Sequence, residues 1–296
     1  MRRALPTTLA VLLSCVTLTM AQRQQKPETI FELVHAFDYT LKQILTPEEY
    51  EAYQSKPPEK IRAESPELYE KIRQNVERWT DDWIRDAVKK YEKLPKERLD
   101  DARRAISRVD GVLQPYFDAR GWPYRTINAV FLPQRLFYDE RDRGTQTYGM
   151  FIPFYPEVFF ATVNPNLPLD LIFMHETIHF NQEGVWMGGP LIEGITDSAA
   201  RHLVSKHGLV SDKQLRRHST YEKERKLVDL IAGEIVERTG GDRESALDML
   251  LEAYVTGDHT RIEAVLGKEA WDQVLDTSRT VRSWHLVTRE VREALN

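Results

Sequence analysis

The chain has 296 residues, 41% hydrophobic and 29% charged, which is enough to form one large domain or two modest ones. Its formal net charge of −5, without an evident basic patch, argues against a nucleic-acid partner. Cys15 is the only cysteine, so the fold cannot depend on disulfides.

The N-terminus has the features of a signal peptide. Arg2 and Arg3 precede an apolar run from Leu9 to Met20, which ends at Ala21 before a polar stretch. The run is too short to span a membrane comfortably. We therefore predict that residues 1–21 are removed, that no stable membrane span remains, and that the mature protein is secreted or periplasmic.

Two other interpretations of this segment stay open. The apolar run could remain as an uncleaved anchor. Cys15 follows Leu12, Leu13 and Ser14, a pattern that also resembles a lipoprotein processing site. A polar tether normally follows a lipidated cysteine, whereas the residues after Cys15 are apolar, so this alternative ranks last.

Residues 22–120 are expected to form a helical N-terminal region. Helix starts are indicated at Thr46-Pro47 and Ser65-Pro66, each followed by glutamate. Apolar residues recur three or four positions apart, as expected for the buried face of a helix. The clearest example consists of Leu68, Ile72, Val76, Trp79 and Trp83.

Residues 121–296 are expected to form a catalytic domain of mixed composition. Segments 126–132, 148–154 and 158–163 are rich in β-branched and aromatic residues and predict a small antiparallel sheet. The third of these is either a candidate for pairing with an extended substrate or a plain core strand. Within 121–187 a helix should follow the sheet and run to about Glu183, and residues 188–296 should be helical, starting with Leu191–His207. The predicted fold class is α+β, predominantly helical.

The sequence His175-Glu176-Thr177-Ile178-His179 is an HExxH motif on the expected helix after the sheet. Positions four apart lie on one helical face, so both imidazoles can bind one ion, with Glu176 beside them. Two histidines and one carboxylate leave a fourth zinc position open, which is typical of a catalytic site. A buried helix carrying two core histidines is the structural alternative.

Glu193 is the preferred third ligand. The metzincin pattern is excluded because Gln182 and Val185 stand where it requires Gly and His. Glu183 competes, but eight residues beyond His175 it has moved along and around the helix. Glu193 begins the next expected helix, and Asp197 lies one turn further on the same face.

The HExxH motif followed by Glu193 and Asp197 resembles the gluzincins, the thermolysin-like zinc metallopeptidases. The match covers about residues 167–200, and its 14-residue interval is shorter than in thermolysin. The resemblance implies that His175, His179 and Glu193 bind zinc, that Glu176 is the general base, and that Asp197 orients His175.

The predicted function is therefore zinc-dependent hydrolysis of a peptide or protein substrate, by a zinc-bound water that Glu176 activates. Tyr221 and His218 are candidates for stabilising the oxyanion. Two alternatives remain: a zinc hydrolase of a non-peptide substrate, and a non-enzymatic helical periplasmic protein with an accidental HExxH. The other histidines of the C-terminal region are interpreted as ordinary helix-face residues: His202, His207, His259 and His285.

Overall fold

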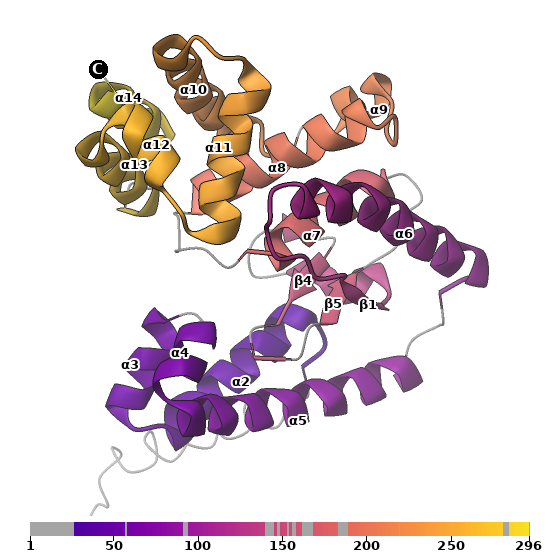
Figure 1. Cartoon of the computed structure of the whole chain (residues 1–296). Coiled ribbons are helices and arrows are strands. Elements are labelled where there is room, and N and C mark those ends of the chain that lie inside the picture. Colours follow the sequence, from indigo (N-terminus) through magenta and orange to yellow (C-terminus); the bar gives the residue numbers. More distant parts are fainter. Residues whose placement is uncertain are drawn as a thin grey trace, which may run out of the picture. The chain divides into compact units, whose positions relative to one another are not determined.

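The computed structural model describes most of the chain, and helices dominate the described part (Figure 1). The predicted signal peptide lies outside it. Among the residues described, no helix has both the length and the apolar character needed to cross a bilayer. The described residues are 27–56, 58–90, 94–139, 145–146, 149–152, 154–155, 158–161, 168–182, 189–218, 220–280 and 284–295.

The chain divides into two compact units. The first consists of the described residues of Met1–Lys93, Pro133–Thr147 and Ile152–Pro156. The second consists of those of Leu94–Leu132, Tyr148–Phe151 and Glu157–Asn296.

Four α-helices, one 3-10 helix and two short strands lie in the described part of the first unit. The predicted helix starts are confirmed: Thr46 caps α3 through a capping box with Glu49, and α5 begins at Pro66. The elements are α2 (Ile30–Ile44), α3 (Pro47–Ser55), α4 (Pro58–Glu64), α5 (Pro66–Lys90), the 3-10 helix η1 (Gln134–Phe137), β2 (Tyr138–Asp139) and β3 (Thr145–Gln146).

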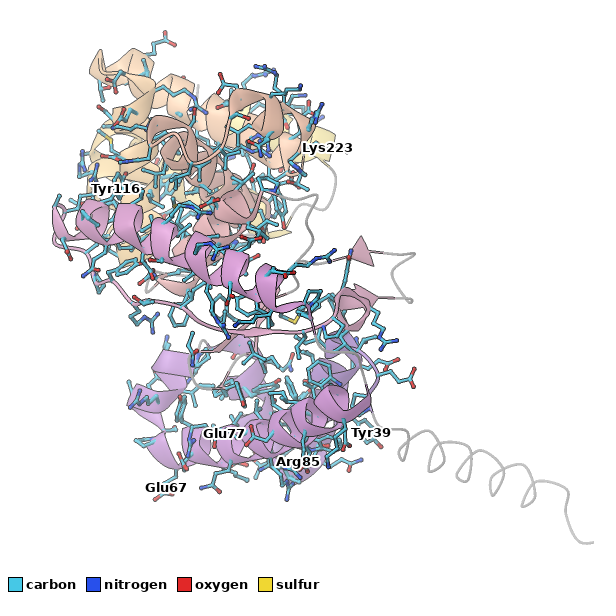
Figure 2. The ribbon with its side chains drawn as sticks, turned by 90° about the vertical axis from the view of Figure 1, so that its right-hand side faces the viewer. Tyr39, Glu67, Glu77, Arg85, Tyr116 and Lys223 are labelled. Atoms are coloured by element: carbon cyan, nitrogen blue, oxygen red, sulfur yellow. The ribbon has the colours of Figure 1, made fainter. Side chains whose placement is uncertain are left out.

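Helix α5 has the amphipathic character that its sequence predicts. Leu68, Ile72, Val76 and Trp83 are buried, at the spacing of one helical face, and Trp79 of the same predicted face is half-buried. The opposite face is charged, and Figure 2 shows labelled side chains of α5 such as Arg85 pointing outward.

The second unit contains the remaining helices and a small sheet. Glycines end several of its helices, for example Gly240 and Gly257, which adopt left-handed backbone conformations after α10 and α11. Its elements are α6 (Lys96–Asp118), β1 (Asn128–Phe131), β4 (Gly149–Phe151), β5 (Val158–Ala161), α7 (Leu169–Phe180), α8 (Gly189–Lys206), α9 (Asp212–Arg217), α10 (Glu222–Thr239), α11 (Arg243–Thr256), α12 (Thr260–Leu266), α13 (Lys268–Thr280) and α14 (Trp284–Leu295).

The prediction of an antiparallel sheet is wrong. The described strands are only two to four residues long, and β5 pairs parallel with β1 and antiparallel with β4. A parallel pair needs a long crossover, and residues 132–157 supply it between β1 and β5. Because β5 is paired on both sides, the hypothesis that this strand accepts an extended substrate is also wrong.

Polar contacts hold both ends of α7 in place. At its start, Asp170 forms a bidentate ion pair with Arg108 of α6, with N–O distances of 2.7 and 2.8 Å. At its end, the buried Asn181 side chain accepts from the Arg125 amide and donates to the carbonyls of Arg125 and Thr177. These bonds end the helix at Phe180, three residues before the predicted Glu183.

Helix α8 packs closely against α10 at Gly194. A Cβ atom placed there would lie 2.5 Å from the Glu224 carbonyl oxygen and 2.8 Å from a Val228 methyl carbon. Only glycine fits this contact without a backbone shift. The close approach fixes α8 directly beside Glu193, the predicted third ligand.

Candidate metal centre

Helix α7 carries the HExxH motif through the core of the second unit. Most of its residues are buried, including Leu171, Phe173, Met174 and Ile178 on several faces. A helix that is apolar all round is expected to be buried rather than at the surface. His175 and His179 therefore lie in a largely dry environment, where polar side chains need partners.

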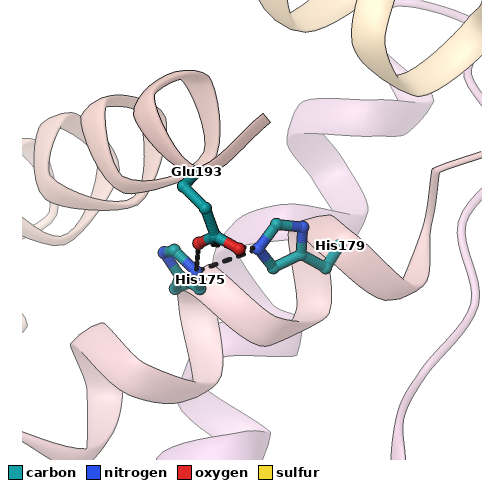
Figure 3. Close-up of side chains that lie close together, drawn as sticks. All are labelled: His175, His179 and Glu193. Carbon is teal, nitrogen blue, oxygen red and sulfur yellow. Dashed lines mark hydrogen bonds and ion pairs between the residues drawn. The ribbon is translucent and has the colours of Figure 1, made fainter. Parts of the chain in front are cut away.

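The structure brings together the three residues predicted as metal ligands (Figure 3). The Nε2 atoms of His175 and His179 are 2.9 Å apart. Glu193 Oε2, from α8, lies 3.2 Å from the first and 3.5 Å from the second. One ligand atom from each residue thus converges on a single point.

The burial of these ligand atoms points to a binding site rather than to a solvated cluster. The side chains of His175, His179 and Glu193 are 9%, 18% and 32% exposed. Within the described part of the chain, Glu193 Oε2 is buried without a hydrogen bond of good geometry. Such an atom is costly unless something else coordinates it. His175, His179 and Glu193 could hold a metal ion.

The two acidic residues of the centre have opposite pKa shifts. Burial raises the pKa of Glu176 to about 7, the charge of Glu193 adds to this effect, and His179 opposes it. Burial alone would also raise the pKa of Glu193, but polar contacts with His175 and His179 outweigh it and lower the pKa below its usual range. Glu193 is therefore the fixed anion, and Glu176 can change protonation near neutral pH.

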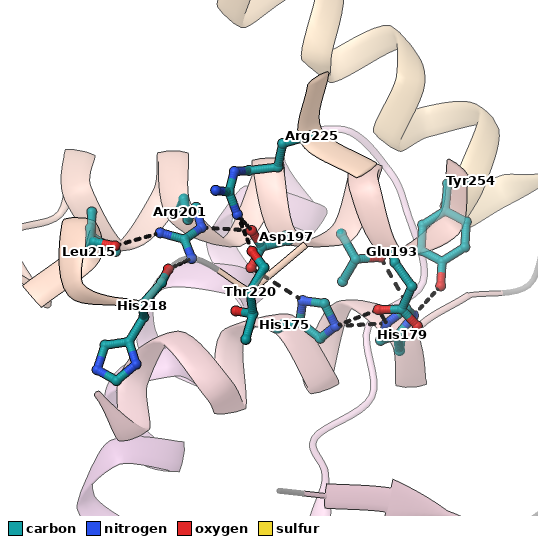
Figure 4. Close-up of polar contacts among 11 residues, drawn as sticks. His175, His179, Glu193, Asp197, Arg201, Leu215, His218, Thr220, Arg225 and Tyr254 are labelled. Atoms are coloured by element: carbon teal, nitrogen blue, oxygen red, sulfur yellow. Dashed lines mark hydrogen bonds and ion pairs between the residues drawn. The ribbon is translucent and has the colours of Figure 1, made fainter. Parts of the chain in front are cut away.

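Asp197 lies on the far side of His175 from Glu193 (Figure 4). Its Oδ1 atom is 3.9 Å from His175 Nδ1, which is too long for a hydrogen bond. Its Oδ2 atom accepts from Arg201 at 2.6 Å and from Arg225 at 2.5 Å. The two arginines hold one oxygen of Asp197 and leave the other facing the imidazole.

The same arginines fix the chain segment before α10. Arg201 donates to the carbonyls of Leu215 and His218, and Arg225 donates to the carbonyl of Thr220. Asp197 thereby connects His175 to the segment that ends at Tyr221, the N-cap of α10.

Of the two oxyanion candidates, the structure brings only Tyr221 to the centre. Its ring stacks on His175 at 5.3 Å between centroids, and its hydroxyl interacts with Glu193. Tyr221 has a φ of 55°, which is uncommon for a residue other than glycine and is often found at functional sites. The His218 side chain points away from the cluster in Figure 4.

Sequence reasoning missed Tyr254, a residue of α11 that reaches the centre. Its hydroxyl lies 2.5 Å from His179 Nδ1, the ring nitrogen that does not face Glu193. Thr196, one turn from Glu193, lies 3.5 Å from the same nitrogen. Thr196 could have been identified from its place between Glu193 and Asp197, whereas nothing in the local sequence connects Tyr254 with His179.

The other histidines are placed outside the cluster, as far as they are described. His202 Nε2 lies 3.5 Å from a carboxylate oxygen of Glu244, and His259 accepts a hydrogen bond from Trp271. The competing ligand Glu183 lies outside the described residues, so the structure does not compare it with Glu193.

No family model matches the chain, and comparison with curated proteins and with solved structures gave no significant match.

Proposed function

We propose that this protein is an exported zinc metallopeptidase of the gluzincin type, secreted or periplasmic after removal of residues 1–21. The observation that carries the proposal is the convergence of two imidazole nitrogens and one buried carboxylate oxygen on one point. Glu176, adjacent in sequence to His175, supplies a group able to carry a proton beside that point.

The donor set fits zinc. Two histidines and a glutamate form a common catalytic zinc set, and ligands about 2.1 Å from a tetrahedral ion are roughly 3.4 Å apart. The three observed separations of 2.9, 3.2 and 3.5 Å are close to this value. A zinc ion held by these residues supplies Lewis-acid chemistry and makes bound water more acidic.

The protein groups around the donors have separable roles in peptide hydrolysis. Glu176 accepts a proton from the attacking water and passes it to the leaving amine. Glu193 stays ionised beside Glu176, because both imidazoles stabilise its carboxylate.

Tyr221 is the candidate for stabilising negative charge on the substrate. Burial first, then the charges of Glu193 and Glu176, raise the pKa of Tyr221, so its hydroxyl remains a hydrogen-bond donor. With 39% of the residue exposed, its ring covers His175 while remaining accessible to a bound peptide. Tyr221→Phe should then lower turnover more than zinc affinity.

Metal analysis of the purified protein tests the proposal. We expect one zinc per chain, lost in His175→Ala and in His179→Ala and severely weakened in Glu193→Ala, because each removes one of three ligands. His202→Ala is the matched control, since His202 lies on α8 but contacts Glu244 outside the centre. Full zinc content in the His175 and His179 variants would contradict the assignment.

Peptide hydrolysis by the zinc-loaded protein tests the second part of the proposal. A stoichiometric zinc ion without activity on any peptide of a diverse mixture would favour a zinc hydrolase of another substrate. A protein that binds no zinc would instead favour the non-enzymatic alternative.

A further inference from the structure

Tyr254 is a buried phenol with a polar contact in the metal centre. The residue is fully buried on α11, and its hydroxyl lies 2.5 Å from His179 Nδ1. Its ring meets the imidazole edge-on, with the planes at 84°. A buried tyrosine hydroxyl normally requires a partner, and here that partner is a proposed metal ligand.

The contact restricts how His179 can be protonated. An imidazole that binds metal through Nε2 is neutral and carries its proton on Nδ1. Nδ1 then donates to the Tyr254 oxygen. The Tyr254 hydroxyl also forms a hydrogen bond with the hydroxyl of Thr196, so a second side chain holds the phenol in place.

We propose that Tyr254 is a positioning residue that fixes the ring orientation and the tautomer of His179 for metal binding. The proposal rests on the proposed function, since it assigns Tyr254 a role toward the same zinc ion. The two imidazoles would then have different supports: a carboxylate beside His175, from Asp197, and a phenol on His179. A carboxylate is the usual partner of a metal-binding histidine, so the phenol makes His179 the less basic ligand.

Zinc affinity and zinc release in Tyr254→Phe test this role. The substitution removes one oxygen and keeps the buried ring. Tyr124→Phe is the matched control, because Tyr124 is also in the second unit and donates its hydroxyl to Asp110, away from the centre. Zinc affinity is measured by competition with a chelator, and stability by urea unfolding of the metal-free proteins.

We expect Tyr254→Phe to bind zinc 10 to 100-fold more weakly and to release it faster, and Tyr124→Phe to bind it as the wild type does. A purely structural hydroxyl would lower the unfolding midpoints of both variants and leave zinc affinity unchanged in both. That result, with a zinc-binding wild type, would overturn the role of Tyr254 alone. A wild type without zinc would overturn the proposed function as well.

Thr196→Val provides a second test should Tyr254→Phe fail to fold. It removes the other partner of the Tyr254 hydroxyl and keeps the shape of a buried side chain. We expect a several-fold loss of zinc affinity, because the hydroxyl of Tyr254 loses the second side chain that holds it against His179. Wild-type affinity in this variant would contradict the proposal.

Discussion

Helices α5 and α8 place their charged residues in opposite environments. In α5 of the first unit, Arg73 bonds to Glu70 and Glu77 on a partly exposed face, while the other face is apolar. In α8 of the second unit, Asp197 is 2% exposed and surrounded by arginines and an imidazole. The charged residues of α5 lie on its exposed face, as expected for an amphipathic helix. In α8, by contrast, the charged side chain of Asp197 is buried.

This contrast distinguishes charged residues that only face the solvent from charged residues that indicate a functional site. An exposed ion pair costs little and contributes little, so α5 needs no further explanation. Burying carboxylates and imidazoles is expensive unless each is paired or binds a metal. The buried polar residues of α7 and α8 therefore indicate a site. Substitutions of charged residues should have larger effects in α8 than in α5.

Asp197→Ala should have the largest effect on stability. It leaves Arg201 and Arg225 without the carboxylate that both contact, and breaking a buried pair in this way costs about 3 to 5 kcal/mol. Urea unfolding measures this cost. The variant should also bind zinc roughly 10 to 100-fold more weakly, because His175 loses its neighbouring carboxylate.

Glu77→Ala in α5 is the matched control for that variant. It removes one of the two carboxylates that contact Arg73. Glu70 remains as a partner, and the Arg73–Glu77 pair is partly solvated. The expected loss is below about 1 kcal/mol. Equal losses in the two variants would remove the distinction between the helices.

Gly194→Ala should have an intermediate effect that reaches the metal centre through the backbone. The new methyl group would meet the backbone of Glu224, which cannot move independently of α10, so α8 must shift and take Glu193 with it. Overpacking of this kind costs about 1 to 3 kcal/mol, and zinc affinity should fall with it. Thermal unfolding and zinc titration measure the two effects.

Gly233→Ala is the opposite case in a neighbouring helix. Gly233 lies in α10 and is exposed, and beyond the adjacent backbone of its own helix no atom lies within 4 Å of the added methyl group. Alanine should stabilise this helix by about 0.5 to 1 kcal/mol. Stabilisation in both glycine variants would show that the close contact at Gly194 is not tight.

The local features of the fold could be predicted from the sequence. The capping residues of α3, the buried face of α5 and the glycines after α10 and α11 each depend on neighbouring residues. The same holds for the convergence of His175 and His179, because it follows from helical geometry. Glu193 was identified by its place at the start of the next helix.

Features that depend on tertiary structure could not be predicted in this way. The strand order follows from a long crossover and not from strand composition, so the parallel pairing of β1 with β5 was missed. Tyr254 and Arg225 reach the centre from helices α11 and α10. The end of α7 at Phe180 depends on a contact between Asn181 and Arg125, which no local pattern indicates.

The substitution Glu176→Gln tests the central claim most directly. It keeps the size of the side chain and removes its ability to accept a proton, and Glu176 is not one of the three converging ligands. Zinc content, melting temperature and peptide hydrolysis are measured on one preparation, with Glu67→Gln on the exposed face of α5 as the control. We expect wild-type zinc content and a melting temperature close to wild type, with hydrolysis reduced by about 10² to 10⁴-fold. Wild-type turnover in this variant would contradict the account, because the HExxH sequence would then not be a catalytic motif.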